Sequence, residues 1–347
     1  MTDNEKYFGK RNIFVTGRAT TGLWLILKKE NIKNKNVLFP ANICYAPIFA
    51  AIYAGNKPVF ADISDWANVS FETLKDKIDN NVACVVLPHM YGKVVNDIKE
   101  IAFYCKEKNI LLVEDCASAF GASYDGKTVG SFGDYSIFSF DYSKIVDVGF
   151  GGIIASNNDL SALSTYEKPL PTYDGDIEDS LGTFSKVYRI IRNAGNNSFV
   201  DGFYKKLPEY MKKYFLFKLS TEQKNEVLEA LTKVDFERER RWNLYRLYEE
   251  KFSENHNIKI CNYSKGDIPW RFSFLYEGER KDFVSYLLKK NIHISDWYPF
   301  IGTMFGFDKK NYVNTDRIEK TIYNLPLEDI EIIENNVYNV NKYLYRN

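Results

Sequence analysis

Two short apolar runs each lead to a residue that could take part in catalysis. Residues 110–113, Ile-Leu-Leu-Val, run into Glu114 and Asp115, and residues 135–140 end four residues before Lys144. Short apolar runs bounded by turn residues are typical of buried strands in a parallel sheet, where ligands gather at the carboxyl ends. An acid and a lysine at one sheet edge are the pair that pyridoxal 5'-phosphate (PLP) chemistry requires. The lysine forms the Schiff base and the aspartate faces the pyridinium nitrogen.

A segment near the start of the chain offers a place for a phosphate group. Residues 17–22, Gly-Arg-Ala-Thr-Thr-Gly, open an amphipathic stretch. Small residues and hydroxyls at a helix start present free backbone N–H groups and threonine side chains, which suits a phosphate. The other interpretation is a plain helix cap without a ligand. The residues alone leave both interpretations open.

The elements that must position these residues alternate between strand and helix signals. Apolar runs at residues 57–62 and 82–87 are followed by a helical pattern at residues 96–108. This alternation predicts βαβ units and a parallel sheet with right-handed crossovers. We expect residues 158–218 to be irregular, because prolines and glycines interrupt their first part. From residue 258 the pattern becomes strand–helix–strand.

These patterns predict two domains. Residues 1–240 would form a large PLP-binding α/β domain with an N-terminal arm, and residues 241–347 a small C-terminal α+β domain. The charge-rich segment at residues 238–241 is expected to lie on the solvated face of a long helix.

The composition excludes several classes of protein. Among the 347 residues, Lys+Arg and Asp+Glu both total 46, so the net charge is zero and nucleic-acid binding is not predicted. A polar start and the lack of any apolar run of membrane-spanning length predict a cytoplasmic protein that does not bind membranes. An odd number of cysteines without C-x-x-C spacing predicts reduced thiols, with neither disulfides nor a metal site. These are Cys44, Cys84, Cys105, Cys116 and Cys261.

Several ordered motifs resemble the DegT/StrS family of PLP-dependent sugar aminotransferases, which have the aspartate-aminotransferase fold. The resemblance covers nearly the whole chain and implies PLP-transferase fold type I. The large domain would have a mostly parallel seven-stranded sheet between helices, followed by the small C-terminal α+β domain. The motifs lie at residues 40–63, 88–92, 114–122, 129–134, 138–144, 151–152 and 324–326.

The resemblance implies a role for individual residues. Lys144 would form the Schiff base with PLP and, once displaced by the amino donor, would move the α-proton as general base and acid. Asp115 would pair with the pyridinium N–H. Ser139, Thr20 and Ala19 would bind the cofactor phosphate. Glu114, the neighbour of Asp115, points to the other face of its strand and is expected to be structural.

At some positions the chain departs from the family pattern. Ser118 replaces the usual Gln near the ring oxygen of PLP. Cys44 stands where the family has an aromatic ring that stacks on the cofactor. Tyr45, beside it, is our candidate for that role, and a buried core tyrosine is the alternative. Arg18 stands where Ser is usual and adds a candidate phosphate ligand. Leu216 falls in a segment that, in the family, reaches the cofactor of a neighbouring subunit.

The implied activity is the transfer of an amino group, from glutamate, to a keto group of a nucleotide-linked or phosphorylated sugar. Such enzymes serve surface-glycan or related amino-sugar biosynthesis, and the family implies a homodimer with active sites at the interface. His89, Arg18 and Tyr298 are the candidate substrate residues. One alternative is a transaminase or decarboxylase that acts on a small phosphorylated three-carbon or similar compound. The other is a non-catalytic sensor or regulator that uses the PLP fold.

Overall fold

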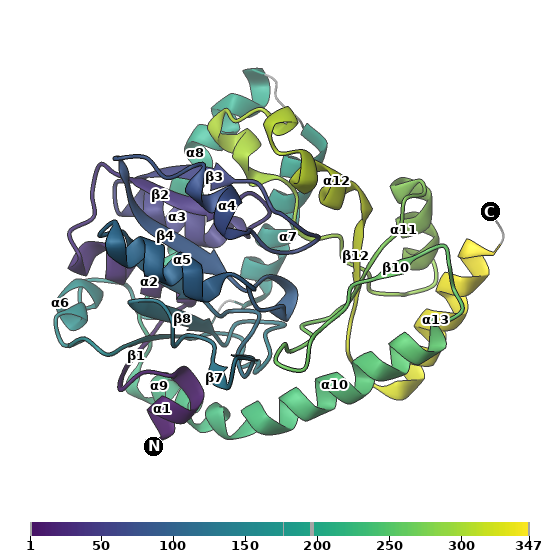
Figure 1. Cartoon of the computed structure of the whole chain (residues 1–347), viewed down its shortest axis with the longest axis horizontal. Helices are drawn as coiled ribbons and strands as arrows, with labels where there is room; N and C mark the ends of the chain where they lie inside the picture. Colours follow the sequence, from purple (N-terminus) through teal and green to yellow (C-terminus); the bar gives the residue numbers. More distant parts are fainter. Residues whose placement is uncertain (1, 176, 195–197, 346–347) are drawn as a thin grey trace.

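The computed structural model of the chain describes residues 2–175, 177–194 and 198–345. A seven-stranded sheet with helices around it forms the larger part (Figure 1). The long helix α10 (Val234–Lys251) leads from there to a small three-stranded sheet near the C-terminus. In the described part of the chain, no helix combines the length with the apolar character that a membrane span requires.

The main sheet has the strand order β1-β9-β8-β5-β4-β2-β3. The five strands from β8 to β3 are parallel, and β9 runs antiparallel to both of its neighbours. The prediction of a mostly parallel seven-stranded sheet is therefore confirmed. The strands are β1 (Asn12–Thr16), β2 (Asn36–Pro40), β3 (Lys57–Ala61), β4 (Val82–Pro88), β5 (Leu111–Asp115), β8 (Tyr135–Ser139) and β9 (Gly152–Ser156).

The central strands form because most of their residues are apolar and are buried on both faces of the sheet. In β8 all five residues are buried, and in β5 four of five are. Such continuous burial is expected where helices cover both faces of a parallel sheet. The register between neighbouring strands determines which residues lie together at the carboxyl edge of the sheet. Pro88 lies opposite Asp115, and Asp115 lies opposite Ile137, so these strands end side by side.

Helices connect the strands and cover the sheet. α2 packs against α3 and against strands β8 and β9, which places its first residues beside the ends of those strands. A short hairpin of β6 (Ser123–Tyr124) and β7 (Lys127–Thr128) precedes β8. The helices before α10 are α1 (Asp3–Phe8), α2 (Ala19–Lys29), α3 (Tyr45–Tyr53), α4 (Phe71–Lys75), α5 (Ile98–Glu107), α6 (Leu163–Glu167), α7 (Ile177–Ala194), α8 (Ser198–Phe215) and α9 (Thr221–Glu229), with 3-10 turns at Met90–Gly92 and Ala230–Lys233.

The expectation that residues 158–218 are irregular is wrong. Helices α7 and α8 occupy most of this segment. Their buried residues recur every three or four positions, which is the period of an amphipathic helix and outweighs the single prolines and glycines. In α7 these are Val187, Tyr188 and Ile191, and in α8 Tyr204, Leu207, Met211 and Phe215.

The C-terminal part surrounds a second apolar core. Its antiparallel sheet has the order β10-β11-β12, with β10 (Lys259–Ile260), β11 (Phe272–Leu275) and β12 (Ile322–Leu325). The helices α11 (Arg280–Leu288) and α13 (Ile330–Leu344) supply further core residues, whereas α12 (Val313–Thr321) and the 3-10 turns at Ile301–Phe305 and Lys309–Asn311 lie toward the first core. In Figure 1, the second half of α10 lies beside α13, far from the N-terminus.

The predicted domain boundary between residues 240 and 241 falls inside the continuous helix α10. Tyr245 and Tyr248, in its second half, belong to the second core, while Val234 at its start belongs to the first. We keep this boundary as a proposal.

Candidate active site

The ends of the central strands open onto a cavity of about 820 Å³. Nine of the ten residues predicted for the site line this cavity, although they come from segments far apart in the sequence. Tyr45 does not line it. The nine are Arg18, Ala19, Thr20, His89, Asp115, Ser118, Ser139, Lys144 and Tyr298.

The Asp115 carboxylate lies at the end of β5, where only 8% of the residue is exposed. Among the described residues, only Ala117 donates a hydrogen bond to it, from its backbone N–H at 3.0 Å. Burial raises the pKa of Asp115, against the opposing influence of that N–H group and of Lys144 and His89. A cationic N–H partner would stabilise the ionised form of such a buried carboxylate.

His89 and Glu114 form a closed pair beneath the cavity. The His89 Nδ1 atom accepts a hydrogen bond from Val95 N at 3.2 Å, which assigns the proton to Nε2. Nε2 then donates to Glu114 at 3.4 Å. Glu114 also accepts from the backbone N–H groups of Gly130, Phe132 and Gly133 at 2.5–2.8 Å. Both ring nitrogens are thus used within the protein, and this placement favours a structural role for His89.

Cys116 lies beside this pair, and ligand atoms of Cys116, His89 and Glu114 all lie within 4.8 Å of one another. Burial raises the pKa of the Cys116 thiol well above its usual value, so the thiol keeps its proton. A metal-binding cysteine is a thiolate. The buried Lys10 ammonium, which donates to Gly133 O at 2.6 Å, already faces the Glu114 charge. These features favour a packed hydrogen-bond network over a metal site.

The first turn of α2 meets the ends of β8 and β9. Ser139, at the end of β8, is the register partner of Gly152, and Ala19 and Thr20 begin α2. A Cβ atom on Gly152 would overlap the backbone of Arg18 and Ala19, so this close approach requires glycine. From the residues that the structure describes, Ser139 Oγ accepts one hydrogen bond, from Asp141 N at 3.4 Å, which leaves its proton for another acceptor. A helix start and a hydroxyl at one point form a site for a phosphate.

Arg18 lies at the same end of the cavity, but its charge is already paired. Its Nε atom lies 3.2 Å from Asp141 Oδ2. The guanidinium also lies over the rings of Phe184 and Phe217, with its Cζ atom 5.7 and 5.6 Å from the two ring centres. Its predicted role as a substrate ligand stays a prediction, and the ion pair indicates that Arg18 also orders the loop after β8.

The loop that carries Lys144 is fixed from outside the main sheet. Arg241, on α10, donates to Lys144 O at 3.0 Å and to Trp270 O at 2.7 Å. Trp270 in turn donates from Nε1 to Ser143 O at 2.8 Å. Ser143 has a φ of 60°, a left-handed conformation that these contacts hold in place. Arg241 is buried, so the expectation of a solvated face at residues 238–241 is wrong for this residue.

Four aromatic residues, Tyr188, Trp270, Trp297 and Tyr298, form an aromatic wall of the cavity. The ring centres of Trp270, Trp297 and Tyr298 lie 6.0–6.4 Å from one another. The Tyr188 ring stacks on the Trp297 ring, with their centres 5.9 Å apart. Tyr188 Oη donates to Cys44 Sγ at 2.9 Å. Tyr188 escaped prediction because α7 was not expected, although the helical period of its apolar residues could have revealed it.

Tyr45, our candidate for stacking on the cofactor, is fully buried in the first core. Its ring lies 4.7 Å from Tyr188 and 5.2 Å from Phe184. The helix α3 turns Tyr45 away from the cavity while its N-cap Cys44 faces it. This placement disfavours a contact between Tyr45 and a cofactor and corresponds to the alternative of a core tyrosine.

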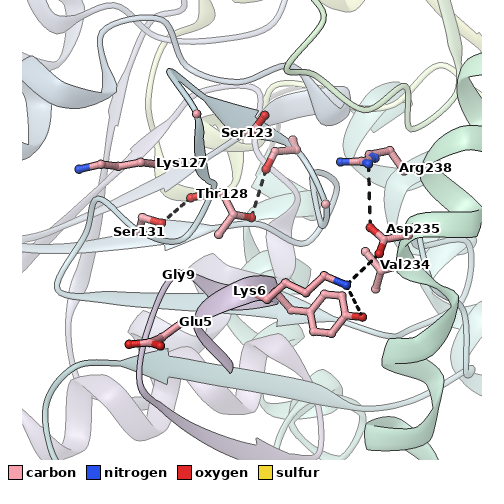
Figure 2. A pocket seen from close by; sticks show the side chains of 14 residues that line it. Glu5, Lys6, Gly9, Ser123, Lys127, Thr128, Ser131, Val234, Asp235 and Arg238 are labelled. Atoms are coloured by element: carbon pink, nitrogen blue, oxygen red, sulfur yellow. Dashed lines mark hydrogen bonds and ion pairs between the residues drawn. The ribbon is translucent and has the colours of Figure 1, made fainter. Parts of the chain in front are cut away.

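A second hollow, of about 790 Å³, lies between α1, the β6–β7 hairpin and the start of α10, and shares no lining residue with the first (Figure 2). Lys6 there pairs with Asp235 at 3.0 Å, and Arg238 lies 3.9 Å from the same carboxylate. Because both cations already face the Asp235 carboxylate, this hollow offers a weaker candidate site than the cavity beside Lys144.

The fold and the sequence are similar to those of known proteins. The model of the DegT/DnrJ/EryC1/StrS aminotransferase family matches residues 2–342. A GDP-perosamine synthase of Vibrio cholerae is 33% identical over 161 residues, which is 46% of this chain and only 44% of that protein. A dTDP-3-amino-3,6-dideoxy-alpha-D-galactopyranose transaminase of Aneurinibacillus thermoaerophilus is 24% identical over 355 residues, 98% of this chain and 87% of that protein.

Solved structures show the same fold. NtdA of Bacillus subtilis, solved with bound cofactor PMP, is similar with a TM-score of 0.76 and 17% sequence identity. The similarity covers 98% of this chain and 75% of that chain. It confirms the predicted fold class.

Proposed function

Because the chain belongs to the DegT/DnrJ/EryC1/StrS aminotransferase family, we propose that it is a PLP-dependent aminotransferase. In this proposal it moves an amino group, from glutamate, to the keto group of a nucleotide-linked or phosphorylated sugar. The names of the two relatives, a GDP-perosamine synthase and a dTDP-amino-sugar transaminase, support a sugar acceptor. The product would be an amino sugar used in surface glycans or related compounds.

The observation that carries the proposal is the convergence of Lys144 and Asp115 on one cavity, which the start of α2 also lines. These residues fit PLP. The buried Asp115 carboxylate, which accepts only the Ala117 N–H among the described residues, would receive the ring N–H. Lys144 would hold the cofactor covalently, and Thr20 and Ser139 would hold its phosphate. When bound, PLP supplies an electron sink for the carbon that loses its proton.

The protein's own residues would do the remaining work. Asp115, in its ionised form, would keep the proton on the ring nitrogen of PLP. Lys144 Nζ would take a proton from the substrate carbon and return it. The hydrogen bonds from Arg241 and Trp270 hold the backbone beside that amine in one position. The aromatic wall limits the access of water to the reacting atoms.

We also propose glutamate as amino donor and a homodimer as the working form, with family membership as the support. Leu216, in the segment that reaches a neighbouring subunit in the family, is buried. Lys218, two residues later, donates to Lys168 O at 2.7 Å within its own chain. This segment would therefore contact a partner subunit in a different way from the family pattern.

The test begins with the absorbance of the full chain purified with PLP. We expect a visible band from cofactor bound to Lys144, which glutamate should convert to the band of the amino form. Lys144→Ala should lose both the band and turnover, and Lys144→Arg, which keeps the charge, should do the same. Glutamate-dependent amination is then measured on nucleotide-linked keto sugars and on small keto-phosphates, with products identified by mass spectrometry.

Each outcome decides between functions. Amination of the keto sugars supports the proposal, whereas turnover of small keto-phosphates alone would replace it with the smaller substrate class. A protein that binds PLP through Lys144 but aminates nothing would point to a sensor. Turnover by Lys144→Ala would remove Lys144 from the mechanism altogether.

A further inference from the structure

Arg271 lies in the aromatic wall of the cavity, immediately before β11. The residue before it, Trp270, donates its Nε1–H to the carbonyl oxygen of Ser143, the neighbour of Lys144. The residue next to Arg271 is therefore hydrogen-bonded to the loop that carries the proposed catalytic amine. Both side chains line the same cavity.

The Arg271 guanidinium has no ion-pair or hydrogen-bond partner among the residues that the structure describes. The exposed acid Glu328 influences it from beyond ion-pair distance. Two other charged side chains of the cavity wall do have ion-pair partners: Arg18 lies 3.2 Å from Asp141, and Asp296 lies 2.7 Å from Arg280. Burial lowers the pKa of Arg271, as expected for a cation removed from water without an anion beside it.

Two tryptophan rings lie against the guanidinium. Its Cζ atom lies 4.8 Å from the centre of the Trp270 ring and 5.6 Å from that of Trp297. The two rings are themselves stacked, 6.1 Å apart and inclined by 23°. These cation–π contacts are not hydrogen bonds, so the N–H donors of the guanidinium remain for another ligand. A fork of parallel N–H donors matches the two oxygens of a carboxylate or a phosphate.

We propose that Arg271 binds an oxyanion of a substrate, a carboxylate or a phosphate group, beside Lys144. The proposal rests on the function proposed above, because it assigns the group to a reactant of the transamination. Two reactants could supply the oxyanion. The amino donor carries carboxylates, and a nucleotide-linked or phosphorylated sugar carries phosphate.

Binding of unreactive anions to the PLP-loaded protein tests this role without any turnover. Glutarate stands in for the carboxylates of glutamate, and inorganic phosphate for the phosphate of the acceptor. PLP is loaded first so that the phosphate site at α2 is filled. Isothermal titration calorimetry should show that the unaltered protein binds at least one of the two anions. Arg271→Gln should weaken that binding roughly 10- to 100-fold, the effect of losing charge-assisted hydrogen bonds.

The matched control is Arg246→Gln. Arg246 also rests on a tryptophan, with its Cζ 5.5 Å from the Trp242 ring, but it does not line the cavity. Its removal should leave anion binding unchanged. Arg271→Lys keeps the charge without the fork and should bind more weakly than the unaltered protein, which decides the question if Arg271→Gln does not fold.

The kinetic arm identifies the source of the oxyanion. If Arg271→Gln raises KM for glutamate, the carboxylate is the ligand, and if it raises KM for the keto substrate, the phosphate is. The proposal is overturned if the unaltered protein binds neither anion, or if Arg271→Gln binds both as tightly as before. A failure of the proposed aminotransferase activity would appear separately, as absent turnover in the unaltered protein, while the binding data would still report on Arg271.

Discussion

The guanidinium of Arg241 donates a hydrogen bond to the carbonyl oxygen of Lys144 across 3.0 Å. Arg241 lies on α10, whose second half enters the C-terminal core, and Lys144 follows a strand of the main sheet. Burial lowers the pKa of Arg241 to about 10, so the guanidinium keeps its charge near neutral pH. The position of the proposed catalytic amine thus depends on a contact made by the helix that joins the two cores.

Replacement of Arg241 by Gln is expected to lower kcat about 100-fold, because small displacements of a reacting group cost rate on this scale. The KM values should change much less, since Arg241 does not line the cavity. Steady-state kinetics would separate the two effects. The pH at which the visible band of the PLP-loaded protein changes should also shift, because the surroundings of the amine change.

Arg241→Lys should recover part of kcat, since an ammonium can still reach one of the two carbonyl oxygens. Arg240→Gln is the matched control. Arg240 occupies the preceding position on α10 but donates to Leu327 O at 3.2 Å and pairs with Glu237 at 3.0 Å. A purely structural role for Arg241 would be indicated by an unshifted absorbance titration and a rate loss equal to the unfolded fraction.

Asp115→Asn should lower kcat by roughly 10²- to 10³-fold, because a neutral amide no longer keeps the ring nitrogen of PLP protonated. Without PLP, the same change should stabilise the protein near neutral pH. The folded-state pKa of Asp115 is raised by burial above its ordinary value of 3.8, so the folded chain holds this proton more tightly than the unfolded chain. That contribution to stability is present below pH 3.8 and is lost as the pH rises through the folded-state pKa.

Thermal unfolding of the two proteins at a series of pH values checks this expectation. Without PLP, the gain in unfolding free energy from Asp115→Asn should grow as the pH rises from about 4 and then level off. With PLP bound the order should reverse, because the ring N–H favours the ionised carboxylate. An advantage that did not change with pH would mean that Asp115 keeps an ordinary pKa in the fold.

Gly152→Ala should disturb the phosphate end of the cavity. The new Cβ atom would overlap the backbone of Arg18 and Ala19, which cannot move aside like the end of a flexible side chain. We expect a loss of roughly 1–3 kcal/mol in the free energy of unfolding, the usual cost of an inserted methyl group in a packed site. The Kd for PLP should rise as well, because the start of α2 must shift.

Gly182→Ala provides a control for which the expected change in the free energy of unfolding has the opposite sign. Gly182 lies exposed in α7, and a Cβ atom there meets no described atom within 4 Å. Its replacement should raise the free energy of unfolding by roughly 0.5–1 kcal/mol, because alanine favours helix more than glycine does. Denaturant unfolding and PLP titration of both variants would test the pair. Equal behaviour of the two would show that the start of α2 tolerates a side chain at residue 152.

Local patterns were sufficient to predict that Asp115 and Lys144 lie at one edge of the sheet, whereas Ser139 was predicted from the family resemblance. Asp115 ends an apolar strand, and Lys144 follows the next strand of the central sheet by a few residues. Because parallel strands end at a common edge, their convergence on one cavity follows from the strand assignments alone.

Contacts between distant segments were not predictable in the same way. Arg241 reaches Lys144 only because α10 packs beside the loop, and Arg271 is notable only because no described acid lies against it in the fold. Tyr188 belongs to a helix whose glycine and neighbouring prolines concealed a clear helical period. Tyr45 was placed one position from the cavity-facing Cys44, and on a helix one position turns a side chain by about 100°.

Strand β3, which lies at one edge of the main sheet, also limits how copies of the chain can associate. An outer strand offers unpaired backbone groups to which another chain can add. In β3, Lys57 is exposed and Pro58 has no N–H to donate. Charge and proline at such an edge discourage strand addition and the aggregation that follows from it. We therefore expect two copies to associate through helices and loops, without forming one continuous sheet across β3.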